Sequence, residues 1–157
     1  YTLSLHDALP ILLLCFLIKG DISMPFVNVK VIENQITLEK KKELVAELTD
    51  LIVKVMGRER EYTVITIDEL KEYQWAIGGV TLDKSSNKEI AVFVNIKVSK
   101  GTTNPDEMNT MIKAIKELIV RVLGNSAITN YVVIDELNPD GWGFDGISMT
   151  ERNKMEQ

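Results

Sequence analysis

FVNVKV at residues 26–31 recurs as FVNIKV at residues 93–98, and this repeat indicates how the chain is organised. Three more blocks recur at the same spacing and without gaps. They are LIVKVMG (51–57) with LIVRVLG (118–124), IDEL (67–70) with IDEL (134–137), and WAIGGV (75–80) with WGFDGI (142–147). Four blocks in one register indicate a duplicated unit. We therefore expect two tandem units, at residues 25–82 and 90–157, joined by a polar linker at residues 83–89.

Each unit has the pattern of a strand, a helix, a second strand and a glycine-containing hairpin. Alternation of β-branched and polar residues predicts the first strand of each unit, and β-branched runs at 62–67 and 128–134 predict the second. In the first unit we expect a helix capped by Thr37 and ended by Gly57. Its counterpart should begin at Thr103 or Asn104, with Pro105 in the first turn, and end at Gly124.

Two tandem β-α-β units of this kind predict an α+β fold, a four-stranded sheet with two helices on one face. The other face would carry polar residues of both first strands mixed with Phe26 and Phe93. Because a sheet face with two phenylalanines is expected to be covered by something, we expect a homo-oligomer.

Composition excludes several kinds of chemistry. The net charge is −5, which gives no basic surface for a nucleic-acid partner. The single histidine, His6, and the single cysteine, Cys15, both precede Met24. From Pro25 onward, disulfides, a histidine or cysteine base and a histidine or cysteine metal site are therefore excluded, and no cofactor is expected. The remaining chemistry has to use carboxylates, lysine, arginine, tyrosine, hydroxyls or a chain terminus.

Residues 1–24 fit poorly with the rest of the chain. Their apolar run at 8–18 is too short to span a bilayer, and it lacks the flanks of a secretion signal. Our hypothesis is that this segment is translated non-coding sequence and that the protein starts at Met24. We therefore leave it out of the fold prediction and expect a cytoplasmic protein with no membrane partner.

The Met24-Pro25 start, the strand PFVNVKV, one amphipathic helix, ITIDEL and WAIGG together resemble the 4-oxalocrotonate tautomerase family, in its fused form with two units per chain. The resemblance covers nearly all of residues 25–150. It implies a homotrimer, a small keto or enol acid as substrate, and an amino-terminal proline as general base and acid. That role falls on Pro25, whose counterpart in the second unit is Val92. The resemblance therefore implies one proline site per chain.

The remaining candidate residues also come from the resemblance. Well-studied members bind substrate carboxylates with two arginines, and neither is present here, so a small mono-anionic acid is expected. The dehalogenase and hydratase branches of the superfamily rank lower for the same reason. The candidate substrate-binding residues are Ile32, Gln35, Trp75, Lys100, Tyr131 and Trp142.

Several interpretations stay open at this point. The two tryptophans are as well suited to hairpin packing as to a pocket wall. The Asp-Glu pairs at 68–69 and 135–136 recur in both units, which favours a structural role. Arg58 and Arg60 follow the first helix and are expected to be exposed, with reach to a neighbouring pocket as the alternative. Two rival functions also remain, a catalytically silent trimeric scaffold and a duplicated module that binds a small ligand between its copies.

Overall fold

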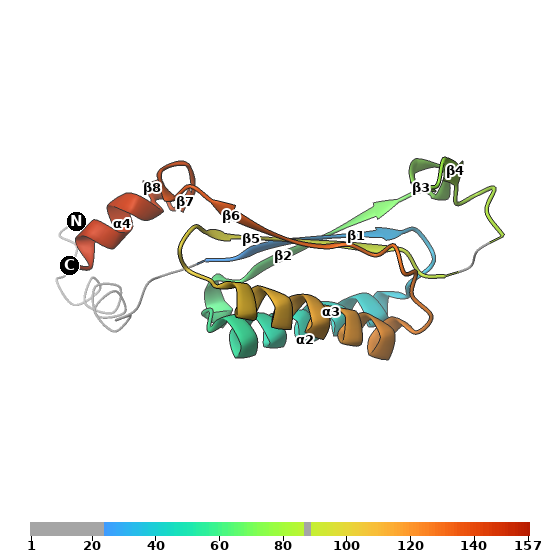
Figure 1. Ribbon diagram of the computed structural model, residues 1–157, viewed down its shortest axis with the longest axis horizontal. Helices are drawn as coiled ribbons and strands as arrows, with labels where there is room; N and C mark the ends of the chain where they lie inside the picture. Colours follow the sequence, from blue (N-terminus) through green and yellow to red (C-terminus); the bar gives the residue numbers. More distant parts are fainter. Residues whose placement is uncertain (1–23, 87–88) are drawn as a thin grey trace, which may run out of the picture.

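The computed structural model describes residues 24–86 and 89–157. The prediction for the upstream segment therefore lies outside the described residues, apart from Met24, and so does the part of the predicted linker at 87–88. The described residues form a four-stranded sheet in the order β2-β1-β5-β6, with α2 and α3 side by side on one face (Figure 1). The predicted α+β architecture is confirmed.

The two copies meet through their first strands. β1 (Phe26–Ile32) runs parallel to β2 (Val64–Leu70), and β5 (Val92–Ser99) runs parallel to β6 (Val132–Leu137). β1 and β5 pair antiparallel, so that the start of β1 lies beside the end of β5. Each hairpin follows the second strand of its copy, and the two hairpins therefore lie at opposite ends of the sheet (Figure 1).

Both helices begin and end where local sequence predicts. α2 (Leu38–Met56) is capped by Thr37, whose side chain accepts a hydrogen bond from the Lys40 amide at 3.2 Å. Gly57 ends it with φ of 63°, a left-handed conformation that glycine adopts without a steric penalty. α3 (Pro105–Leu123) is capped by Asn104, which accepts from the Glu107 amide at 3.0 Å.

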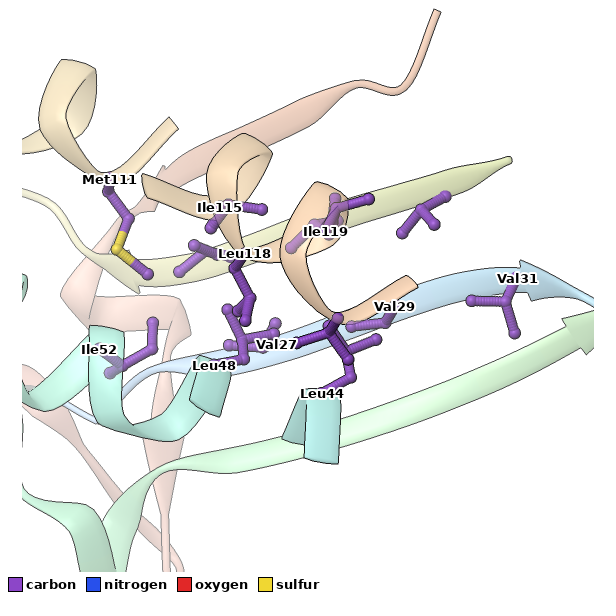
Figure 2. Close-up of a cluster of buried hydrophobic side chains, with 14 of the residues drawn as sticks. Val27, Val29, Val31, Leu44, Leu48, Ile52, Met111, Ile115, Leu118 and Ile119 are labelled. Carbon is purple, nitrogen blue, oxygen red and sulfur yellow. The ribbon is translucent and has the colours of Figure 1, made fainter. Parts of the chain in front are cut away.

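The core lies between the sheet and the two helices (Figure 2). Alternate residues of β1 and β5 point into it and meet the apolar stripes of both helices. The members drawn and labelled in Figure 2 are Val27, Val29, Val31, Leu44, Leu48, Ile52, Met111, Ile115, Leu118 and Ile119. Each is at most 1 % exposed, and burying a side chain of this size contributes roughly 1.5–3 kcal/mol. This layer holds the sheet, and with it the ends of the strands, in place.

Three local features differ from the predictions. The second strands begin later than predicted, at Val64 and Val132, and continue through both IDEL segments; in the first copy a 3₁₀ turn, η1 (Arg60–Tyr62), precedes β2. Arg58 was expected to be exposed and is instead buried, because its guanidinium donates to the Thr102 carbonyl and hydroxyl of the other copy. The last residues, predicted only as a tail, form the short helix α4 (Met149–Met155).

Each hairpin is a two-stranded ribbon entered through a 3₁₀ turn. In the first copy η2 (Glu72–Gln74) leads into β3 (Ala76–Ile77) and β4 (Val80–Thr81). In the second, η3 (Pro139–Gly141) leads into β7 (Gly143–Phe144) and β8 (Ile147–Ser148). Within the described ranges, none of the helices is long and apolar enough to cross a membrane.

Candidate active site

Pro25 lies at the head of β1 and is buried. Its carbonyl oxygen accepts a hydrogen bond from the Val64 amide at 3.3 Å, which ties the start of β1 to the edge strand β2. A cavity of about 230 Å³ opens beside it. The residues around the cavity are Met24, Pro25, Phe26, Tyr62, Val64, Trp142, Gly143 and Phe144. The cavity therefore combines the first strand of one copy with the hairpin of the other.

The second hairpin is held over this end of the sheet by its turn and by α4. Asp145 and Gly146 have φ of 51° and 73°, the paired positive values of a tight two-residue hairpin turn. The Trp142 carbonyl accepts the Met149 amide at 2.8 Å, and the Met149 side chain is only 2 % exposed. These contacts fix Trp142 and Phe144 on either side of Gly143, facing the cavity.

The walls of the cavity are mostly apolar. Two of the lining side chains carry a strong hydrogen-bond donor, the hydroxyl of Tyr62 and the indole N–H of Trp142. The Tyr62 ring lies 5.9 Å from the Phe144 ring, centroid to centroid and tilted by 39°. An apolar chamber of this kind favours the neutral form of an amine and strengthens the few polar contacts that it offers.

Comparison with known proteins agrees with this fold. The family model described as "Tautomerase enzyme" matches residues 25–84 and again residues 93–152, one match for each copy. The chain belongs to the tautomerase family. The predicted family and the tandem arrangement of its units are thereby confirmed, and family membership supports a tautomerase-type isomerase.

Single relatives give the same result. The probable tautomerase K2 of Dickeya dadantii (strain 3937) is 43% identical over 56 residues, which are 36% of this chain and 84% of that protein. The structure of Pt0534 inactivated by 2-oxo-3-pentynoate matches with a TM-score of 0.71 at 19% identity, over 81% of this chain and 98% of that one. A fused 4-OT described as a wild-type symmetric trimer matches with a TM-score of 0.69 at 18% identity, over 80% and 96%. Because both identities are below 25%, these two structures show only that the present chain shares their fold.

The chain brings only some of the predicted site residues together. Trp142 lines the Pro25 cavity. Lys100 follows β5 directly, so it lies at the same end of the sheet, although it is not part of the lining. Its amide donates to the Leu137 carbonyl at 2.8 Å, which places it beside the end of β6.

The other four predicted residues lie at the far end of the sheet. Ile32 and Trp75 pack with Leu82 and Ala91 in a separate apolar cluster. The remaining two lie near this end as well: the Gln35 side chain accepts the Ala91 amide at 3.3 Å, and Tyr131, 69% exposed, precedes β6. The reason is geometric, since β1 has seven residues and therefore spans about 23 Å between its two ends.

Two lining residues, Tyr62 and Phe144, were missed by sequence reasoning. A comparison of the two copies contains the signal, because Tyr62 corresponds to Thr129 and Phe144 corresponds to Ile77. Of the two copies, only the positions around the proline end of β1 therefore carry Tyr62 and Phe144, and the equivalent positions carry non-aromatic residues. The signal has meaning only once the antiparallel pairing of β1 and β5 shows which hairpin faces Pro25.

The repeated aspartates form a polar network instead of an acid–base pair. Asp68 accepts from Lys30 at 2.9 Å and Asn28 at 3.1 Å, and these hydrogen bonds lower the pKa of its carboxyl group. Asp135 accepts from Asn95 at 2.7 Å, which is the largest cause of its own lowered pKa. Carboxylates held ionised in this way are poor proton donors near neutral pH, which agrees with a structural role.

No metal centre is evident in the part of the tautomerase chain that the structure describes. Among residues 24–86 and 89–157, no group of three or more histidine, cysteine, aspartate or glutamate side chains is arranged to hold an ion.

Proposed function

We propose that this chain is a keto–enol tautomerase of small 2-oxo or 2-hydroxy-alkenoic acids. In the proposed active form the chain begins at Pro25, whose free secondary amine acts as general base and general acid. The observation that carries the proposal is the position of Pro25, buried at the wall of an apolar cavity and facing Tyr62, Trp142 and Phe144. No cofactor takes part in the proposed reaction.

The amine suits proton transfer because of where it lies. A free α-amino group has a pKa of about 8 in model peptides. Burial among apolar walls disfavours the ammonium form and lowers that pKa toward the working pH, where a general base is most effective. The neutral amine takes the proton of the enol hydroxyl and the resulting ammonium returns a proton to carbon. The proton count is unchanged and the amine is regenerated.

The two donors in the lining would stabilise the charge that develops on the substrate oxygen. In an apolar chamber, fixed donors such as the Tyr62 hydroxyl and the Trp142 indole N–H are worth more than in water, because they need no reorganisation during the reaction. Phe144 and Val64 would exclude water from the same space. The binding face is therefore suited to a small acid with an apolar or aromatic body.

We further propose that the active protein is a homotrimer. Phe26 and Phe93 lie half-buried on the face of the sheet opposite the helices, where another chain would cover them. A relative of the same fold is described as a trimer. Light scattering of the protein in solution should give the mass of three chains, and a monomeric mass would contradict this proposal.

A rate measurement tests the role of the proline. Protein beginning at Pro25 should convert the enol of phenylpyruvate to the keto form, and Pro25→Ala should lose about 10²- to 10⁴-fold in kcat/KM, the usual contribution of a general base. A chain in which residues before Pro25 are retained should be inactive, because its nitrogen is then an amide. Full activity in either protein would refute the proposal. No rate above buffer in the wild type would favour the silent scaffold.

A covalent probe tests the same residue independently. Because 2-oxo-3-pentynoate inactivates Pt0534, it is a suitable reagent for an enzyme of this fold. Treated protein should gain one adduct per chain, and digestion should locate it on the peptide that begins at Pro25. An adduct confined to a lysine, with Pro25 unmodified, would argue against the proposed base.

A further inference from the structure

We propose that Arg152, stacked on Phe144, favours anionic over neutral ligands at the Pro25 cavity through its positive charge. The proposal rests on the proposed function, since it concerns the ligand of the same site. It assigns a cation to a site where neither family arginine is present and where Lys100 lies outside the lining.

Arg152 is attached to Phe144 in two ways. Its guanidinium carbon lies 3.6 Å from the centroid of the Phe144 ring, which is the geometry of a cation–π contact. Its Nη2 donates to the Phe144 carbonyl at 3.1 Å. The contacts join α4 to β7 and hold the ring that forms one wall of the cavity. Arg152 therefore controls the position of that wall.

No carboxylate of the described residues neutralises the charge of Arg152. Among the described residues it has no carboxylate oxygen within ion-pair distance, and its buried Nε has no hydrogen-bond partner. Lys154, the other basic residue in the last turn of α4, does form an ion pair, with Glu151 at 2.7 Å. An uncompensated, half-buried guanidinium leaves a positive potential at this end of the sheet.

The duplication supplies an internal comparison. One repeat earlier, the position of Arg152 is occupied by Ser85 and that of Phe144 by Ile77. The hairpin that carries Ile77 faces Val92, which has no amine, and its cluster is filled by Ile32, Leu82 and Ala91. Among the described residues, the stacked Phe–Arg pair thus lies at the end of the sheet that carries the proline. At the position of α4 the described residues of the first copy form a turn at 82–84 and no helix, so the pair belongs to the second copy together with α4.

The distances permit an electrostatic effect on the ligand. A ligand atom in van der Waals contact with the other side of the Phe144 ring would lie roughly 7 Å from the guanidinium carbon. At this distance a unit charge changes the affinity for an anion by about threefold at the dielectric of water and by about fiftyfold at an effective dielectric of about 20, so about five- to tenfold is expected for a half-exposed charge. The ligand class that fits is a small monocarboxylate with an apolar body.

Calorimetric binding separates the charge from the structure and does not need turnover. The probes are 3-phenylpropanoate and its neutral isostere 3-phenylpropanamide, titrated into protein that begins at Pro25. Arg152→Gln should weaken carboxylate binding about five- to tenfold and leave amide binding within twofold. Arg152→Lys should recover most of the carboxylate affinity. Lys154→Gln, which removes the same charge from the same helix, is the matched control and should change neither.

The outcomes are distinct from those of the proline experiment. Equal losses for carboxylate and amide in Arg152→Gln would overturn the proposal, since they would show a role in wall packing alone. Failure of the wild-type protein to prefer the carboxylate would overturn it as well. The wild-type protein can prefer the carboxylate over the amide, and lose this preference in Arg152→Gln, even if it converts no enol. That result would support the role of Arg152 and contradict the proposed reaction. In active protein, the same variant should raise KM more than it lowers kcat.

Discussion

Gly143→Ala offers the sharpest test of the hairpin as part of the active site. Gly143 stands between Trp142 and Phe144 in the cavity wall. A Cβ added there would lie 2.4 Å from the Ile147 carbonyl oxygen and 2.9 Å from the Ser148 Cα. Both are backbone atoms of the facing strand β8, so a side-chain rotation cannot relieve the contact.

The size of the effect follows from the geometry. Since ordinary contact begins near 3.4 Å, the two strands of the hairpin would have to separate by about 1 Å. Overpacking of this kind costs about 1–3 kcal/mol, which here falls on the hairpin and α4 because the sheet core is not touched. A displacement of 1 Å in a positioning group lowers turnover by up to about 10²-fold. We expect kcat/KM to fall by one to two orders of magnitude.

Hydrogen exchange and kinetics would measure the two parts of this prediction. Peptides that cover residues 139–155 should exchange faster in Gly143→Ala, while those from β1 and β5 should keep wild-type rates. Gly141→Ala is the matched control, because a Cβ at that position meets nothing within 4 Å. If both variants had the same activity and the same exchange, the hairpin would not shape the site and the reasoning would be wrong.

Two further predictions concern the framework that supports the site. Leu118→Ala should lower the free energy of unfolding, measured in urea, by about 2–5 kcal/mol, because Leu118 is only 1 % exposed. Leu38, at 57 % exposure, is the control, and Leu38→Ala should lower this free energy far less. Similar losses in the two variants would contradict the assigned core. Asp135 has a pKa lowered by hydrogen bonds from Asn95 and Lys97, so its contribution to stability is present above the pKa of the unfolded chain and is lost as pH falls through the folded value. Asp135→Asn should therefore cost under about 1 kcal/mol at pH 7 and nothing at strongly acidic pH, and a cost independent of pH would refute the assignment.

Much of the fold follows from local sequence signals. Alternating residues in β1 and β5 and the helical stripes of α2 and α3 specify which faces are buried, because side-chain periodicity differs between strands and helices. Caps such as Thr37 and Asn104 mark the helix ends. The duplication then requires that both units share one architecture. α4 also has a local signal, which sequence reasoning missed, because Ser148 caps it by accepting from the Glu151 amide at 3.2 Å; its first residue, Met149, is buried.

Residue identity and order along the chain were sufficient to predict the family, the tandem units and the candidate base. The surroundings of Pro25 depend instead on how the strands pair. Antiparallel pairing of β1 with β5 places the second hairpin, and not the first, at the head of β1, together with Phe144 and Arg152. Parallel pairing of β1 with β2 places Tyr62 at the same end and sends Trp75 to the far end. Which side chains meet across two strands depends on the direction of their pairing, and that direction is set by long-range packing of the core.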